Sequence, residues 1–375
     1  MSNVGLLAET DAATDNQDAP EALGVDTPDA PGWDAIDEAL REMYGQQEAW
    51  QWRTVQTFGQ GGGDPLDCIC AYRVDGQKPH WHYVSYGMSE LYEKRSRDRL
   101  RSGWGFEFTL RLTRQGDETQ PPVWPLRLLQ HLSRYVVQTG NVFQPGDHMD
   151  VNGPIAEGFD TMLRAAMFAA DPLLSAIDTP NGRVRFVQVV GVTLDELRAA
   201  KAWNITGFLE LFSTCRDPLL RTDLRRRSIL KHPPVRAALE IRSHAEGSAT
   251  RMVYATGVQF KESGWLRRSL SISLDANVVG DLVTLLSARL SHGRPLTVRG
   301  QSQAVTFESG PELRWRVRGD DVTVTLPPRA VTEVAGSLTS HAGTYRLAAA
   351  PGLTLHVEPC QLRDLAGNNV RVCGV

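Results

Sequence analysis

The sequence predicts an α+β fold of mixed α/β type, with strands and helices distributed over two domains. Several segments alternate apolar and polar residues, as strands do, whereas others repeat apolar residues at steps of three and four, as amphipathic helices do. The chain has 375 residues, of which 41% are hydrophobic, so it can bury two cores of ordinary size. A polar stretch at 246–248 is the expected boundary between the domains.

In the first domain a helix is expected at 33–44. The apolar residues of 106–112 alternate with polar ones and predict the clearest strand of the chain, whereas 159–170 fits a strand or a helix equally well. Thr193 and Glu196 form a capping-box pattern, which predicts a helix that runs to about Trp203. Further strands are expected at 54–58, 66–72, 81–86 (half-buried) and 183–190, with a helix at 234–244 and an apolar segment at 205–212.

The second domain is expected to be richer in strands, and its tail past Ala348 shows little periodicity. The first 30 residues contain no Lys or Arg and many Ala, Asp and Pro, so 1–30 is expected to be a disordered acidic leader. The elements expected in the second domain are strands at 252–260, 269–274, 296–299, 304–307, 313–317 and 322–326, and helices at 278–290 and 330–338.

Composition argues against several classes of partner. The formal net charge of −4 gives no general attraction to nucleic acid or to anionic membranes. We expect no membrane-spanning segment and no signal peptide, since no long apolar run is present and the start carries no basic residues. The five cysteines are odd in number and scattered, which is typical of a protein of the reducing cytoplasm without a disulfide framework.

The segment 124–148 is the most informative part of the chain. Its apolar residues have helical spacing, Pro125 suits the first turn of the helix, and Gly140 suits its end. The chain then turns through 145–146 and is expected to present Asp147 on a loop. This arrangement would place the phenol of Tyr135 and the carboxylate of Asp147 on the same wall of a cleft. No catalytic signature accompanies them. The plain alternatives are a surface tyrosine on a helix and an aspartate that caps a turn.

Motifs that could indicate chemistry have simpler interpretations. The glycines of 59–63 lack the Lys-Ser/Thr ending of a P-loop and predict a hairpin turn, and no nucleophile elbow is present. His80 and His82 share one face of a strand, so a metal-dependent hydrolase that adds Asp147 and His148 to them remains an alternative. We expect no enzymatic activity, no cofactor and no metal.

Two other clusters leave alternatives open. Cys68 and Cys70, as alternate strand residues, are expected to point into the core. An Arg-rich cluster could bind nucleic acid, but a solvated face that pairs with Asp217 and Asp223 is the commoner explanation, so nucleic acid is not an expected partner. The arginines of this cluster are Arg221, Arg225, Arg226 and Arg227.

A series of short motifs follows in a specific order along 31–212. These motifs are PGWDAIDEAL at 31–40, GGDPLD at 62–67, HWHY at 80–83, GWGFEFTLRL at 103–112, PPVWP at 121–125, RYV at 134–136, GN at 140–141 followed by Phe143, GDH at 146–148 and LEL at 209–211. In content and order they resemble the Suppressor of fused family. A fainter likeness continues through 225–226 and 291–294 to 304–307.

The resemblance implies two lobes, each a mainly antiparallel or mixed sheet with flanking helices, joined by a hinge near 246–248. It assigns 31–247 to the N-terminal domain and 248–375 to the C-terminal domain. In animals the family restrains Hedgehog signalling by sequestering Gli-type transcription factors, without catalytic activity. An extended segment of the factor adds as a β-strand in the cleft between the lobes, which close around it.

Carried over position by position, the resemblance implies that Tyr135, Phe143, Asp147 and Asp171 are partner-binding residues. The long acidic insertion of the animal proteins is missing, which suggests a bacterial member. Bacterial relatives resemble immunity proteins of polymorphic toxin systems, so the expected partner is a protein or peptide segment, with a toxin as the candidate.

Overall fold

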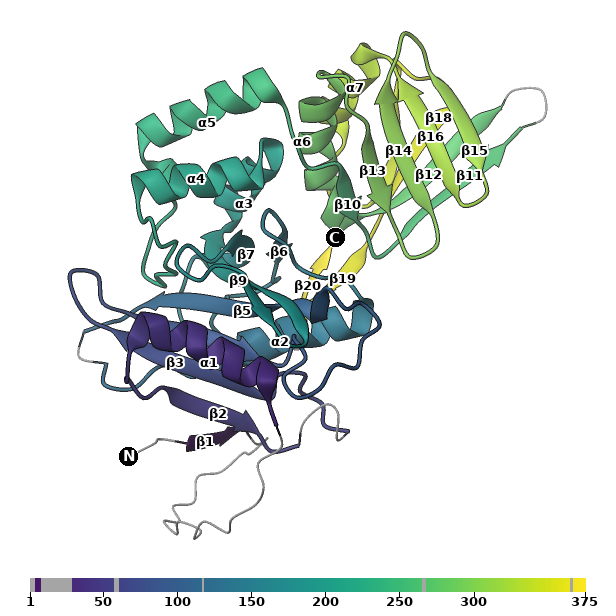
Figure 1. Ribbon diagram of the computed structural model, residues 1–375. Helices are drawn as coiled ribbons and strands as arrows, with labels where there is room; N and C mark the ends of the chain where they lie inside the picture. The colour runs from purple at the N-terminus through teal and green to yellow at the C-terminus, as the bar shows by residue number, and fades with distance from the viewer. Residues whose placement is uncertain (1–3, 8–28, 57–60, 117, 265–267, 365–366) are drawn as a thin grey trace. The chain divides into compact units, whose positions relative to one another are not determined.

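The computed structural model describes residues 4–7, 29–56, 61–116, 118–264, 268–364 and 367–375 (Figure 1). Packing divides the chain into two compact units. The first comprises Met1–Met149, Pro154–Gly191 and Asp217–Arg226, and the second comprises Asp150–Gly153, Val192–Arg216 and Arg227–Val375. Strands and helices occur together in both units, which confirms the predicted α+β class.

A mixed sheet organises the first unit. Its strands are β1 (Val4–Leu7), β2 (Trp50–Thr54), β3 (Cys68–Val74), β4 (His80–Tyr86), β5 (Arg101–Thr113), β6 (His148–Asp150), β7 (Leu163–Ala170), β8 (Ile177–Thr179) and β9 (Gly182–Thr193). They are ordered β1-β2-β3-β4-β5-β9-β7-β6, and β8 pairs with β9. Neighbours from β2 to β5 are antiparallel, whereas β5 and β9 are parallel.

Helices α1 (Pro31–Tyr44) and α2 (Trp124–Thr139) account for the burial of β4. Tyr44 of α1 stacks on Tyr72 of β3, with ring centroids 4.3 Å apart, and bonds to His82 of β4. The next residue, Tyr83, points to the other face, where its hydroxyl donates to the Pro122 carbonyl just before α2, at 2.7 Å. Because both faces are covered, all of β4 is buried. The prediction of a half-buried strand is therefore wrong.

In the described residues, the second unit contains three further sheets. Its helices are α3 (Leu194–Ala202), α4 (Ile205–Cys215), α5 (Pro233–Glu246), α6 (Val279–Leu290) and α7 (Pro328–Ser337). Its strands are β10 (Met252–Tyr254), β11 (Val258–Ser263), β12 (Ser269–Asp275), β13 (Leu296–Arg299), β14 (Ala304–Ser309), β15 (Arg314–Arg318), β16 (Asp321–Leu326), β17 (Gly343–Arg346), β18 (Leu353–Glu358), β19 (Cys360–Arg363) and β20 (Asn369–Cys373). The sheets are ordered β10-β13-β14-β16-β15 and β11-β12-β18-β17, and β19 pairs with β20. Among the described residues, no helix is long and apolar enough to cross a membrane.

Helix α3 begins as its sequence predicts, with Thr193 and Glu196 forming a capping box. It packs with the C-terminal residues, because Lys201 pairs with Asp281 of α6 and the Ser248 hydroxyl donates to the Lys201 carbonyl at 2.6 Å. The expected boundary at residue 247 therefore does not coincide with the division between the units.

Four other expectations differ from the structure. Strand β2 begins at Trp50, which packs edge-on against Trp81 at 5.1 Å between centroids, rather than at Thr54. The strand expected at 252–260 is split into β10 and β11, because the Gly257 N–H turns to donate to Asp275. The tail past Ala348 contains β18 to β20, and the apolar residues of β1 pair with β2 inside the predicted leader. Residues 57–58 of the predicted strand, Gly59 and Gln60 of the predicted hairpin turn, and 1–3 and 8–28 of the leader lie outside the described residues.

The buried carboxyl group of Glu107 fixes the loop that follows β4, which contacts the first turn of α1. Glu107 of β5 is fully buried and accepts hydrogen bonds from the hydroxyls of Ser85 and Ser89, both at 2.6 Å, and from the N–H groups of residues 87–89. The loop continues to Leu91, whose carbonyl accepts from the Gly32 N–H at 2.9 Å. A Cβ at Gly32 would lie 2.2 Å from the Glu90 carbonyl oxygen, so this approach requires glycine.

Replacement of Glu107 by Ala should lower the free energy of unfolding by at least about 3 kcal/mol, because several buried donors lose their acceptor. Burial raises the pKa of Glu107 to about 7 from 4.5, although its donors oppose the shift. The folded chain therefore keeps a proton there that the unfolded chain releases. The resulting stability is full below pH 4.5 and is lost as pH rises through 7.

Urea unfolding from pH 4.5 to 8 measures this effect as the difference between the native chain and Glu107→Gln, whose side chain does not titrate. Glu42→Gln, on the exposed side of α1, is the matched control and should keep the native pH profile. An identical profile for native and Glu107→Gln proteins would contradict the assignment.

Candidate functional site

Helix α2 and the turn after it form the wall predicted from the sequence. Pro125 lies in the first turn of α2. The helix ends at Gly140, which adopts a left-handed conformation with φ 75° and donates its N–H to the Val136 carbonyl. Both predicted ends are confirmed. The left-handed residue reverses the chain, so that 141–147 returns toward the sheet.

Aromatic rings tie this returning segment to the sheet. Phe143 is 5% exposed and stacks on Phe168 of β7, with centroids 4.0 Å apart and planes 19° apart. Tyr135 of α2 also stacks on Phe143, with ring centroids 5.5 Å apart and planes 30° apart. We call Tyr135, Phe143 and Phe168 the ring stack. The Tyr135 hydroxyl accepts a hydrogen bond from the Asn141 side chain at 3.1 Å, which holds it at the surface end of the stack.

Asp147 is fixed to the same strand through its backbone. The Phe168 N–H donates to the Asp147 carbonyl at 2.9 Å, and the Gly146 N–H donates to the Phe168 carbonyl at 2.8 Å. The carboxylate accepts from the Gln144 N–H at 2.8 Å, and the residue is exposed. Nearby protein still raises the pKa of Asp147 by desolvation, partly offset by the Gln144 N–H. Tyr135, Phe143 and Asp147 are thus brought together around Phe168.

The strand next to Asp147 lies at the end of the sheet. The expected loop stops at Asp147, since His148 begins β6, a strand of three residues. β6 pairs with β7 and is the last strand in the order of this sheet. An edge strand presents backbone donors and acceptors that an added strand can pair with.

Asp171 has a different environment. Its side chain is 0% exposed, and its two oxygens accept from both terminal nitrogens of Arg111, at 2.5 and 3.0 Å. The Thr109 hydroxyl and the N–H groups of Leu173 and Leu174 also donate to it, at 2.7, 2.9 and 2.8 Å. Burial alone would raise the pKa of Asp171, but His82 and Arg111 lower it well below its ordinary value. The carboxylate is therefore charged, saturated with donors and enclosed.

The histidines named in the hydrolase alternative do not join Asp147. His82 is buried, and its Nδ1 bonds to the Tyr44 hydroxyl at 2.6 Å, while Nδ1 of His80 bonds to the Lys78 carbonyl at 3.1 Å. Burial lowers the pKa of each to about 4, so both are neutral at pH 7. Within the described part of the chain, no group of three or more His, Cys, Asp or Glu residues could hold a metal ion. The predicted cluster of His80, His82, Asp147 and His148 is not formed.

Two of the four arginines of the Arg-rich cluster are buried, whereas Arg225 and Arg227 are exposed. Arg221 is buried and makes a two-pronged pair with Asp217, with both nitrogen–oxygen distances 2.6 Å. Arg226 is also buried and donates to the Gly191 carbonyl at 2.9 Å. The pairing with Asp217 agrees with the simpler interpretation, but the predicted solvated face is wrong for these two arginines. Buried guanidinium groups are not available to bind phosphates, which argues against the nucleic-acid hypothesis.

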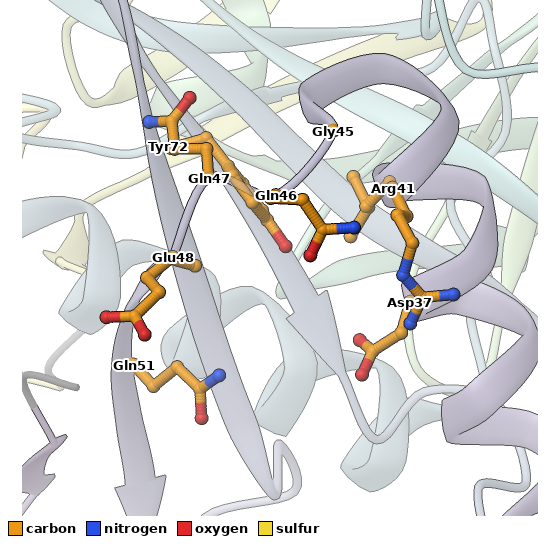
Figure 2. Close-up of a pocket in the computed structure, with 10 residues that line it drawn as sticks. Asp37, Arg41, Gly45, Gln46, Gln47, Glu48, Gln51 and Tyr72 are labelled. Carbon is orange, nitrogen blue, oxygen red and sulfur yellow. The ribbon is translucent and has the colours of Figure 1, made fainter. Parts of the chain in front are cut away.

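A polar pocket that sequence analysis did not predict lies between the end of α1 and β2 (Figure 2). Its volume is about 250 Å³. The amides at 46–47 and at Gln51 could have indicated it, since they flank the link from helix to strand. One of these amides, Gln47, already donates to the Arg73 carbonyl at 3.0 Å. The lining residues are Asp37, Leu40, Arg41, Gly45, Gln46, Gln47, Glu48, Ala49, Gln51 and Tyr72.

Removal of the Asp171 charge should destabilise the first unit. In Asp171→Asn the Arg111 guanidinium stays buried without a counter-charge, and the free energy of unfolding should fall by about 3–5 kcal/mol. The double variant Arg111→Met/Asp171→Leu should recover part of that loss, because neither charge remains. Asp178→Asn is the control, since that side chain is 82% exposed and should change stability by less than about 0.5 kcal/mol. Urea unfolding with native-like stability for Asp171→Asn would contradict the proposed ion pair.

Comparisons with known proteins bear on this site. The family described as "Suppressor of fused protein (SUFU)" matches residues 62–227, which include Tyr135, Phe143, Asp147 and Asp171. The human and mouse proteins named "Suppressor of fused homolog" are each 38% identical over 209 residues, which is 52% of this chain and 43% of theirs. The chain therefore spans less than half the length of these curated relatives.

Two solved structures show the same similarity. One, described as "Crystal structure of Drosophila Suppressor of Fused", superposes with a TM-score of 0.72 at 25% identity, covering 88% of this chain and 97% of that one. Another, described as "the Sufu-Fu complex crystal structure", gives a TM-score of 0.53 at 34% identity, covering 56% of this chain and 98% of that one. The resemblance seen in the motifs is confirmed. This chain belongs to the Suppressor of fused family.

Proposed function

We propose that this protein captures an extended segment of a protein partner at the wall formed by the ring stack, Asp147 and the edge of β6, and that it performs no chemistry of its own. The observation that supports this most directly is the position of Asp147, an exposed carboxylate held immediately before an edge strand. A relative in the same family was solved in a complex described as Sufu-Fu, which supports a protein-binding role.

Affinity and selectivity have different sources in such a site. A strand added along β6 would gain main-chain hydrogen bonds, which segments of many sequences can make. Asp147 would select among them, because a cationic His, Lys or Arg of the segment can donate a charge-assisted hydrogen bond to it. Neighbouring protein partly desolvates the Asp147 carboxylate and thereby raises its pKa, so a nearby cation would stabilise the charged form. The Tyr135 hydroxyl would add a second polar contact.

The other two predicted site residues would act from inside the protein. Phe143 is almost fully buried, so its part is to hold Tyr135 and the turn against Phe168. Asp171 is enclosed with Arg111 and would position the end of β7, the strand that carries Phe168. In this proposal, direct contact with the partner is made by Tyr135 and Asp147.

The partner's identity is the more specific part of the proposal. Gli-type factors are the partners implied by the animal family, whereas for a bacterial cytoplasmic member a toxin is the partner that we propose. Closure of two lobes around the segment also stays a prediction. Purification of the complex formed with the protein encoded by the adjacent gene tests the toxin proposal. Stoichiometric binding that blocks the toxin supports it, and no binding to that protein contradicts it.

Charge reversal at Asp147 tests the site. Peptides of about 12 residues are first selected from a displayed random library on the native chain, and affinity is then measured by fluorescence anisotropy. Asp147→Arg should raise the dissociation constant by at least about 100-fold, because the attraction between Asp147 and a cationic residue of the peptide becomes repulsion. The melting temperature should change little, since the carboxylate has one hydrogen bond in the described structure, to the Gln144 N–H.

The matched control is Asp160→Arg, which makes the same charge change at another exposed position of the first unit and should bind as the native chain does. Selected peptides should be enriched in His, Lys or Arg at one position. Unchanged affinity for Asp147→Arg would show that the segment binds elsewhere.

A further inference from the structure

Two cysteines face each other across the hairpin of β19 and β20. Cys360 is the direct register partner of Cys373 in this antiparallel pair. Directly opposite residues of antiparallel strands have Cα atoms about 4.5–5.5 Å apart, which falls within the range that a disulfide spans. Both thiols are free in this structure.

The two thiols differ in environment. Cys360 is half-buried, so a small oxidant can reach it, whereas Cys373 is 7% exposed. Arg371 donates to the Cys373 sulfur from Nε at 3.3 Å and from a terminal nitrogen at 3.2 Å. The thiolate is the nucleophile in disulfide exchange, and these two hydrogen bonds hold the Cys373 sulfur in position for it. Burial raises the pKa of Cys360, with further contributions from Asp275 and Cys373.

The other close pair of free cysteines, Cys68 and Cys70, is less suited to a disulfide. The sulfurs of Cys68 and Cys70 are 3.9 Å apart, but the residues are 0% and 2% exposed in the core beneath α1. They are alternate residues of one strand, so their Cα atoms are about 6.6 Å apart, near the upper limit for a disulfide. Cys68 and burial raise the pKa of Cys70 well above its ordinary value.

We propose that Cys360 and Cys373 form a reversible disulfide by exchange with a low-molecular-weight disulfide such as glutathione disulfide. The Cys360 thiol loses its proton and attacks glutathione disulfide, which gives a mixed disulfide at Cys360 and releases one glutathione thiolate. The Cys373 thiolate then attacks the Cys360 sulfur and releases the second glutathione thiolate. The protein loses two protons and two electrons, and the glutathione disulfide gains the two electrons. This proposal does not depend on the proposed function.

The disulfide would restrain a hairpin that holds other parts of the second unit. The Arg363 carbonyl accepts from the Asn152 side chain at 2.9 Å, and the Gly374 carbonyl accepts from the Ala342 N–H at 2.9 Å. Asn152 follows β6 by two residues and has a positive φ of 56°. A crosslink across the hairpin limits its local opening, so the oxidised form would hold the segment 150–153 more firmly.

The test uses the full chain in glutathione redox buffers, followed by alkylation and peptide mapping by mass spectrometry. The native protein should lose two of its five free thiols and yield a peptide that links Cys360 to Cys373. Cys373→Ser should retain glutathione on Cys360. Arg371→Gln should accumulate that mixed disulfide, with ring closure slowed about tenfold, because the attacking Cys373 sulfur loses the two hydrogen bonds that position it. Circular dichroism of each variant checks that it is folded.

Three results would overturn the proposal. These are a folded native chain that yields no peptide linking Cys360 to Cys373 in excess glutathione disulfide, a link between Cys68 and Cys70 in its place, or closure in Arg371→Gln as fast as in the native chain. Hydrogen exchange tests the consequence separately. Oxidation should slow exchange of the amides at 150–153, and unchanged exchange would show that the hairpin does not restrain them.

Discussion

Phe143 lies between the ring of Tyr135 and the ring of Phe168, and this stacking is the contact on which the partner-binding wall depends. The left-handed Gly140 turns the chain back after α2, but the turn alone would leave 141–147 without a fixed position. Burial of Phe143 on β7 anchors the segment, and the backbone bonds of Gly146 and Asp147 with Phe168 then align it with the sheet. A hydrophobic contact therefore determines where an exposed carboxylate is presented, which is how selectivity can be combined with a rigid scaffold.

Beneath the wall lies a buried polar layer that the hydrophobic core must accommodate. Arg111, Asp171 and His82 are enclosed together, and Gln188 also accepts from Arg111. A buried ion pair of this kind is weak evidence for net stability, but removal of one partner is costly because the other charge remains. The pair ties β5 to the residue that follows β7, across the intervening β9, so it supports the strand that carries Phe168.

Local patterns predicted local structure well. Helices α1 and α2, with the Pro and Gly at the ends of α2, were predicted within a few residues, as was the capping box of Thr193 and Glu196. Burial on both faces of β4 was not predicted, because an alternating pattern of aromatic and polar residues does not show that a second helix covers the polar face. Nδ1 of His82 is hydrogen-bonded to the hydroxyl of Tyr44, 38 residues away in sequence, and no sequence spacing indicates such a contact.

The candidate site was predicted in part. The turn signal identified Asp147, and the family motifs added Phe143 and Asp171. The enclosure of Asp171 could not be predicted, because its partner Arg111 is 60 residues away in sequence and meets it only when β5, β9 and β7 assemble in one sheet. In the tail, β19 and β20 were missed because they owe their pairing to each other and not to a strong apolar pattern. The missed β18 does alternate apolar and polar residues, which could have indicated it.

A charge-swap cycle tests most directly whether Asp147 contacts a cation of the bound segment. The cationic residue of a selected peptide is replaced by Glu, and its affinity is measured against the native chain and against Asp147→Lys. We predict that each single change weakens binding. The changed peptide should bind Asp147→Lys at least about tenfold more tightly than it binds the native chain, because the ion pair is re-formed with opposite polarity. Losses that simply add would contradict a direct contact between Asp147 and the partner.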